Sequence, residues 1–126
     1  MLSTSTFDVP KAQWEAAKAE AKAIMIERAK MRGMTAYSDL VSRIHAFALK
    51  AHDPRLFHLL GQISSEEDAA GRGMLTVIVV HKVGDMQPGP GFFELAKSLG
   101  RDTRDLLKCW VGELHRVHAV WSQHDA

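Results

Sequence analysis

The chain has 126 residues, 46% of them hydrophobic, which is typical of a single domain that buries a core of its own, and we predict one domain over residues 1–126. The 16 basic and 15 acidic side chains nearly cancel, which excludes a strong overall attraction to nucleic acid or to a membrane surface. Cys109 is the only cysteine, which excludes an internal disulfide and a zinc cluster built from cysteines.

The two ends of the chain are polar and show no clear pattern of a helix or a strand. We expect residues 1–10 to form a flexible or edge segment and residues 122–126 to form a tail. Residues 1–8 carry no cationic stretch followed by an apolar one, and no run approaches the 18 apolar residues of a membrane span. These features predict a small soluble protein of bacterial type, located in the cytoplasm.

Three helices are predicted in the first half of the chain. Residues 11–31 are rich in alanine and repeat apolar side chains at helical spacing. Gly33 ends that helix, and a second one is expected over about 35–48. A third is expected over about 53–68, because the aspartate before Pro54 can cap free amides and proline fits a first helical turn.

A seven-residue apolar run, Met74–Val80, follows these helices. Its Val and Ile content and its flanking glycines predict a buried strand that ends at His81 and Lys82. A loop rich in glycine and proline comes next. A lone strand needs a partner, for which the candidates are residues 90–93 and residues 5–9.

Two helices are expected after the loop, over residues 92–99 and from a cap at Asp102 onward. The last helix has one apolar stripe that should dock on the core: Leu106, Trp110, Leu114, Val117 and Trp121. The predicted fold is therefore α+β and mostly helical, with about five helices and a small sheet of two or three strands. The order of elements matches a winged-helix unit, with the third helix facing a DNA groove and residues 82–90 as the wing.

Two stretches resemble a known family. Residues 34–44, MTAYSDLVSRI, are similar to the Thr-x-x-Tyr-Gly-x-(Leu/Val)-Ala helix opening in the DNA-binding domain of alkylguanine-DNA alkyltransferases and of the alkyltransferase-like proteins. Residues 77–92, VIVVHKVGDMQPGPGF, are similar to their Ile-Pro-Cys-His-Arg-Val-Val stretch and the glycine-rich loop after it. The order of elements also agrees over about residues 29–99.

The resemblance implies roles for individual residues. Tyr37 stands where the family has the tyrosine that helps to rotate a nucleotide out of the duplex, and His81 and Lys82 stand where it has the histidine and arginine after its reactive cysteine. Val80 takes the place of that cysteine, which removes the nucleophile and implies DNA binding without alkyl transfer. The family's Arg-Ala-Val-Gly segment before the strand has no match, so its intercalating arginine has no equivalent here.

The first functional hypothesis is a non-enzymatic module that binds double-stranded DNA. Tyr37 and His81 would shape a site for a base or for the minor groove. Four basic side chains would contact phosphates: Arg43, Arg55, Arg72 and Lys82. The acidic run at residues 64–68 is expected to be a solvated helix end, and it would repel phosphate beside the third helix.

The second hypothesis is a small-ligand or enzyme site at the glycine-rich loop. Backbone amides of residues 89–92, including Gly89, Gly91 and Phe92, would hold an anion next to His81 and Lys82 at a helix start. His81 would then be the natural acid or base.

A third hypothesis is an interaction with another protein through the exposed face of the last helix, including Val120 and Trp121. No catalytic constellation and no cofactor are predicted. Metal binding is not expected either. Glu113, His115 and His118 occupy neighbouring turns of the last helix, but two histidines at i and i+3 cannot by themselves close a tetrahedral site, for which zinc needs three or four convergent ligands.

Overall fold

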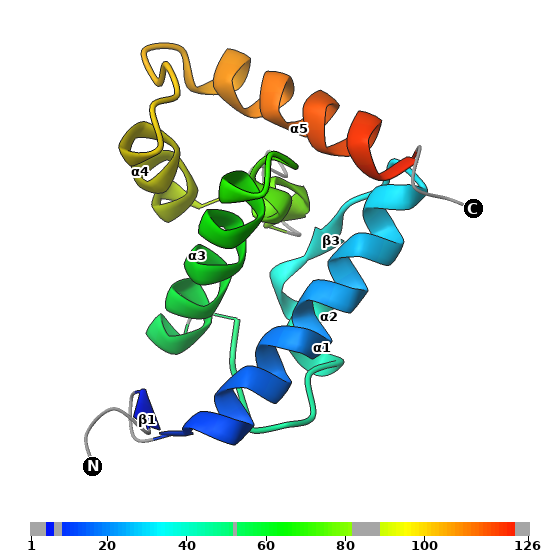
Figure 1. Ribbon diagram of the computed structural model, residues 1–126, viewed down its shortest axis with the longest axis vertical. Coiled ribbons are helices and arrows are strands. Elements are labelled where there is room, and N and C mark those ends of the chain that lie inside the picture. Colours follow the sequence, from blue (N-terminus) through cyan, green and yellow to red (C-terminus); the bar gives the residue numbers. More distant parts are fainter. Residues whose placement is uncertain (1–4, 7–8, 52, 82–88, 123–126) are drawn as a thin grey trace.

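The computed structural model describes residues 5–6, 9–51, 53–81 and 89–122 (Figure 1). Within these residues the chain is α+β and mostly helical, as predicted. The helices are α1 (Lys11–Lys30), α2 (Tyr37–Ser42), α3 (Pro54–Ala69), α4 (Pro90–Ser98), α5 (Leu106–Ser122) and the 3-10 helix η2 (Leu75–Ile78). The strands are β1 (Ser5–Thr6), β2 (Val9–Pro10), β3 (Thr35–Ala36) and β4 (Val79–Val80).

The strands form two small pairs. β1 and β2 are antiparallel, whereas β3 and β4 are parallel, with Thr35 opposite Val79 and Ala36 opposite Val80. Both predicted partners of the apolar run are therefore wrong, because residues 90–93 begin α4 and Ser5–Thr6 pair with β2. The predicted wing, residues 82–90, lies outside the described residues except for its last two.

The apolar run Met74–Val80 is buried along its whole length, as predicted, but only its last two residues form a strand. Side chains replace the missing ladder hydrogen bonds. The Ser64 hydroxyl accepts a hydrogen bond from the Thr76 amide at 3.1 Å, and the Val77 carbonyl accepts one from Trp110 Nε1 at 3.1 Å. Buried backbone groups need such partners, so the run closes into η2 instead of extending.

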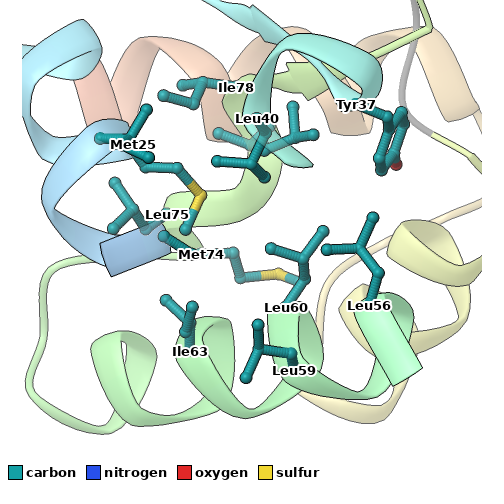
Figure 2. Packing of buried hydrophobic residues seen from close by; sticks show 14 of the residues in the cluster. Met25, Tyr37, Leu40, Leu56, Leu59, Leu60, Ile63, Met74, Leu75 and Ile78 are labelled. Atoms are coloured by element: carbon teal, nitrogen blue, oxygen red, sulfur yellow. The ribbon is translucent and has the colours of Figure 1, made fainter. Parts of the chain in front are cut away.

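Three helices surround this run. α1, α3 and α5 all pack against η2, and α5 crosses the end of α1 at the top of Figure 1. His118 of α5 lies 2.9 Å from the Gly33 carbonyl, which fixes that crossing. Figure 2 shows the side chains of α1, α3 and η2 meeting in one cluster, with Tyr37 at its edge on the side of Leu56.

The second helix is much shorter than the predicted 35–48. It ends at Ser42 because the Glu20 carboxylate of α1 accepts hydrogen bonds from the amides of His45 and Ala46 at 2.9–3.2 Å. These amides would otherwise bond within a continuing helix. A contact between distant parts of the chain therefore overrides the local helical pattern.

The last helix starts four residues after the predicted cap. Asp105, not Asp102, binds an amide of its first turn, that of Lys108 at 3.1 Å. The prediction that the apolar stripe of this helix docks on the core is wrong for Leu106, which is 48% exposed.

The acidic run at residues 64–68 is not a solvated helix end. Ser64 is buried, and Glu67 is only 1% exposed. The Glu67 carboxylate lies 2.9 Å from Lys22 Nζ and 2.7 Å from Arg72 Nε. The hydrogen bond from Arg72 lowers the pKa of Glu67, although burial acts in the opposite direction. The carboxylate therefore remains charged inside the fold and joins α1, α3 and the turn after α3.

Candidate functional site

The parallel β3–β4 pair brings Tyr37 and His81 together. Each residue follows directly after one of the paired positions Ala36 and Val80, so the two side chains leave adjacent strands at the same end. Their ring centroids are 5.0 Å apart, with the planes inclined at 41°. Phe57 of α3 meets the Tyr37 ring edge-on, with a centroid separation of 6.0 Å.

Gly89, the residue before α4, is hydrogen-bonded to this pair. The Gly89 amide donates a hydrogen bond to the Tyr37 hydroxyl at 3.1 Å. A Cβ at position 89 would lie 3.4 Å from His81 Nε2 and 3.6 Å from the Tyr37 hydroxyl, so glycine allows this close approach. Pro90 then opens α4 in the first helical turn, where its fixed φ suits a helix.

Burial of the Tyr37 ring raises the pKa of its hydroxyl, and the Gly89 hydrogen bond only partly opposes that shift. Tyr37 is 8% exposed. The hydroxyl therefore stays protonated near neutral pH. Within the described residues its oxygen accepts one hydrogen bond while its proton has no acceptor, which leaves a donor for a bound molecule.

A cavity of about 910 Å³ opens beside these residues, between α3 and α4. Its lining includes the predicted residues Tyr37, His81, Gly89, Gly91 and Phe92. This volume is within the range that takes a small organic ligand.

Two helix glycines contribute no side chain to the lining of this cavity. Gly61 lies in the middle of α3 and Gly91 in the first turns of α4, and both line the cavity. A Cβ at either position would meet no atom within 4 Å. Glycine in a helix interior destabilises the helix by about 0.5–1 kcal/mol relative to alanine, and here packing in the protein does not require it.

The charged part of the lining contains more carboxylates than cationic side chains. Lys18 Nζ lies 2.8 Å from Glu66 and 3.4 Å from Glu15. Burial by itself lowers the pKa of Lys18, but the hydrogen bonds and charges of Glu66 and Glu15 outweigh it and raise that pKa. A third carboxylate, Glu94 of α4, lines the same cavity and has no ion-pair partner among the described residues.

The basic side chains expected to bind phosphate do not gather at this cavity. Arg43 lies 3.9 Å from Glu27, Arg55 lies 2.6 Å from Asp53, and Arg72 binds the buried Glu67. None of these three arginines lines the cavity. Lys82 lies outside the described residues.

The loop amides expected to hold an anion are mostly engaged. The Gly89 amide binds Tyr37, the Phe92 amide donates to the Gly89 carbonyl at 3.1 Å, and Pro90 has no amide hydrogen. Gly91 is the remaining donor of the four residues. The geometry of this loop therefore fits a wall of a cavity better than an anion site.

One residue of the interaction face predicted on the last helix is buried. Trp121 is 8% exposed, and its ring lies under the Arg72 guanidinium at 5.8 Å, so the prediction of an interaction face built on Trp121 is wrong. His118 is buried against Gly33, whereas His115 is exposed. No three potential metal ligands converge anywhere in the described part of the chain.

Phe57, Gly61 and Glu94 are among the members of the cavity lining that the sequence does not predict. Phe57 is 44% exposed and lies off the buried face of α3, so the apolar repeat that predicts this helix does not mark Phe57 as a site residue. Gly61 did carry a signal, since glycine interrupts an otherwise good helix. Glu94 is close to the cavity only because α4 packs against α3.

No protein-family model matches this chain, and no curated protein sequence or solved structure shows significant similarity to it. Among the helices that the structure describes, none combines the length and apolar character needed to cross a bilayer.

Proposed function

We propose that this protein binds a small flat organic molecule in the cavity between α3 and α4. The observation that carries the proposal is the cavity itself, about 910 Å³ in volume and walled by the aromatic side chains of Tyr37, Phe57 and Phe92. A mostly apolar cavity with a few convergent polar groups is typical of a ligand site. The two open helix glycines support this proposal, because they provide room that the fold does not use.

The polar groups at one end of the cavity would orient the ligand. Tyr37 offers its hydroxyl proton, and His81 offers a ring nitrogen that has no hydrogen-bond partner among the described residues. Flat rings stack on such side chains at centroid separations of about 4.5–7 Å. A hydrogen-bond acceptor on the ligand would face Tyr37, while the body of the ligand would lie along Phe57 and Phe92.

The residues that line the cavity support ligand binding without catalysis. Tyr37 holds its proton near neutral pH, and among the described residues the exposed His81 has no second group that would orient it as a general base. The one cysteine, Cys109, does not line this cavity, and burial raises the pKa of its thiol.

The test is calorimetric titration with 1-naphthylmethanol, a neutral flat molecule, supported by saturation-transfer NMR. We expect saturable binding to the wild-type protein. Gly61→Leu should abolish it, because the new side chain would occupy the cavity. Gly112→Leu is the matched control, since Gly112 is also inside a helix with nothing within 4 Å of its Cβ but lines a different cavity.

Binding that survives Gly61→Leu, or that Gly112→Leu weakens equally, would place the ligand elsewhere and overturn the proposal. An absence of binding to the wild-type protein would also count against it. Circular dichroism of both variants at 25 °C checks that each is folded.

A second candidate function is DNA binding of the alkyltransferase-like type. The observation in its favour is the proximity of Tyr37 and His81, at 5.0 Å between ring centroids, because the resemblance to that family gives these two residues a shared site. The engaged arginines and the carboxylates around the cavity argue against it, since phosphate contacts supply most of the affinity for DNA.

This second candidate is tested by fluorescence anisotropy with a labelled duplex, with and without an alkylated guanine, at two salt concentrations. Tight, salt-sensitive binding that His81→Ala/Lys82→Ala loses would favour a DNA module. No binding at low salt would refute the DNA hypothesis and leave the small-ligand proposal intact.

A further inference from the structure

We infer that the cavity between α3 and α4 prefers a flat organic cation, such as an aryl amine that is protonated at neutral pH. This inference rests on the proposed function and names the class of ligand for that same site. Its basis is that carboxylates and aromatic side chains line one cavity together.

The carboxylates give the cavity a negative local charge. Glu15, Glu66 and Glu94 line it, and the single ammonium group among the described lining residues is that of Lys18. Lys18 is shared between Glu15 and Glu66, at 3.4 Å and 2.8 Å, so it balances one of these two charges. Glu94 adds a further negative charge from the opposite helix, α4.

The carboxylates differ in how open they are to a ligand. The side chains of Glu15 and Glu66 are 52% and 53% exposed, whereas that of Lys18 is 14% exposed and is paired with both of them. The carboxylates are therefore more accessible to an incoming molecule than the lysine is. An anionic ligand would face repulsion at this surface, and a cationic one would be attracted.

The aromatic wall favours the same sign of charge. The faces of aromatic rings attract cations, and Tyr37, Phe57 and Phe92 line the cavity from β3–α2, α3 and α4 respectively. The rings also provide apolar surface for a flat hydrocarbon body. The two parts of the lining together fit a molecule with an aromatic body and a positively charged substituent.

A second cavity in the described residues does not share this character. It has a volume of about 590 Å³ and is lined by both signs of charge, with Arg104 at 2.7 Å from Asp102 and Arg101 at 2.9 Å from Glu113. Two of its three carboxylates, Asp102 and Glu113, are already matched by guanidinium groups. It contains no aromatic side chain in its lining.

The test compares three probes that share one ring system: 1-naphthylmethylammonium, 1-naphthylmethanol and 1-naphthoate. Titration calorimetry with the full chain at pH 7 and low salt should give about tenfold tighter binding for the cation than for the alcohol, from cation–π and carboxylate attraction. The naphthoate should bind more weakly than the alcohol. The preference for the cation should shrink in 0.5 M NaCl, because salt screens exposed charges.

Glu94→Gln should weaken binding of the cation severalfold and leave the alcohol unchanged. Glu27→Gln is the matched control, because Glu27 is an exposed helical glutamate, 63% exposed, that does not line the cavity. It should alter neither affinity.

The outcomes separate this inference from the proposed function. If the cation and the alcohol bind equally, or the carboxylate probe binds best, the inference is overturned while the cavity remains a ligand site. If none of the three probes binds, both the inference and the proposed function are refuted.

Discussion

Replacement of the buried Glu113 by glutamine should be strongly destabilising. Glu113 is 6% exposed, and its carboxylate accepts hydrogen bonds from the Met74 amide at 2.8 Å and from Arg101 Nε and Nη2 at 3.0 and 2.9 Å. A carboxamide of the same shape has one acceptor oxygen in place of two, and its NH2 group would face donors.

The magnitude follows from these three bonds. A hydrogen bond to a charged group contributes about 1.5–3 kcal/mol, and removing one partner of a buried ion pair costs about 3–5 kcal/mol. Arg101 keeps a second carboxylate, Asp68 at 2.6 Å, which limits the loss. We therefore expect Glu113→Gln to lower the free energy of unfolding by about 3 kcal/mol.

Urea denaturation followed by far-UV circular dichroism measures this loss. With a slope of about 2 kcal/mol per molar urea, the midpoint should fall by about 1.5 M. Asp102→Asn is the control, because it removes one carboxylate from the exposed pair with Arg104 and should leave the midpoint unchanged within error. Equal shifts for the two variants would refute the argument that burial makes the Glu113 network important.

Three further predictions concern glycine, pH and the Tyr37 hydroxyl. Gly73→Ala should lower the free energy of unfolding by at least twice the roughly 1 kcal/mol expected of Gly71→Ala. Both glycines have positive φ, but only at Gly73 would a Cβ lie 3.1 Å from a buried carboxylate oxygen. Equal falls in Tm for the two variants would contradict this prediction. The pKa of Glu67 is lowered by its arginine partner, so the ionised carboxylate stabilises the fold above about pH 4.3 and this stabilisation is lost as the pH falls further. Glu67→Gln should therefore flatten the loss of stability between pH 5 and pH 3. An unchanged slope would argue against a stabilising role of the carboxylate. Tyr37→Phe should lower the free energy of unfolding by about 1 kcal/mol and accelerate hydrogen exchange of the Gly89 amide, which loses its acceptor. Unaltered exchange would show that the hydrogen bond is not formed in solution.

Local sequence patterns were sufficient to predict the long helices. The alanine-rich segment yields α1 because its apolar side chains repeat at helical spacing, and Asp53 caps α3 as expected, with its carboxylate 2.9 Å from the Arg55 amide. These signals act within a few residues, so they can be read without knowledge of the rest of the chain.

Elements determined by distant contacts were not predictable in the same way. The apolar run becomes η2 because Ser64 and Trp110 bind its backbone, and α2 stops early because Glu20 binds the amides after it. Each of these bonds joins residues at least 12 positions apart. Such pairings depend on how the helices pack, which periodicity does not encode.

The candidate site shows the same division. Local motifs predict Tyr37, His81 and Gly89 as site residues, and these three lie together in the structure. Phe57 and Glu94 belong to the same cavity only because α3 and α4 pack side by side (Figure 1). The three described arginines were selected for their charge alone, and each has a carboxylate nearby.

The complete burial of Met74–Val80 has a consequence for the unfolded chain. This stretch contains no charge and no proline and is rich in β-branched residues, which is the composition of segments that self-associate into sheets. In the folded protein the helices that pack around η2 hide this stretch from other molecules. Arg72 and Lys82 flank the stretch two residues away on either side, where charges discourage stacking between chains. Refolding yield should therefore fall with protein concentration, and substitution of either flanking charge by alanine should promote aggregation.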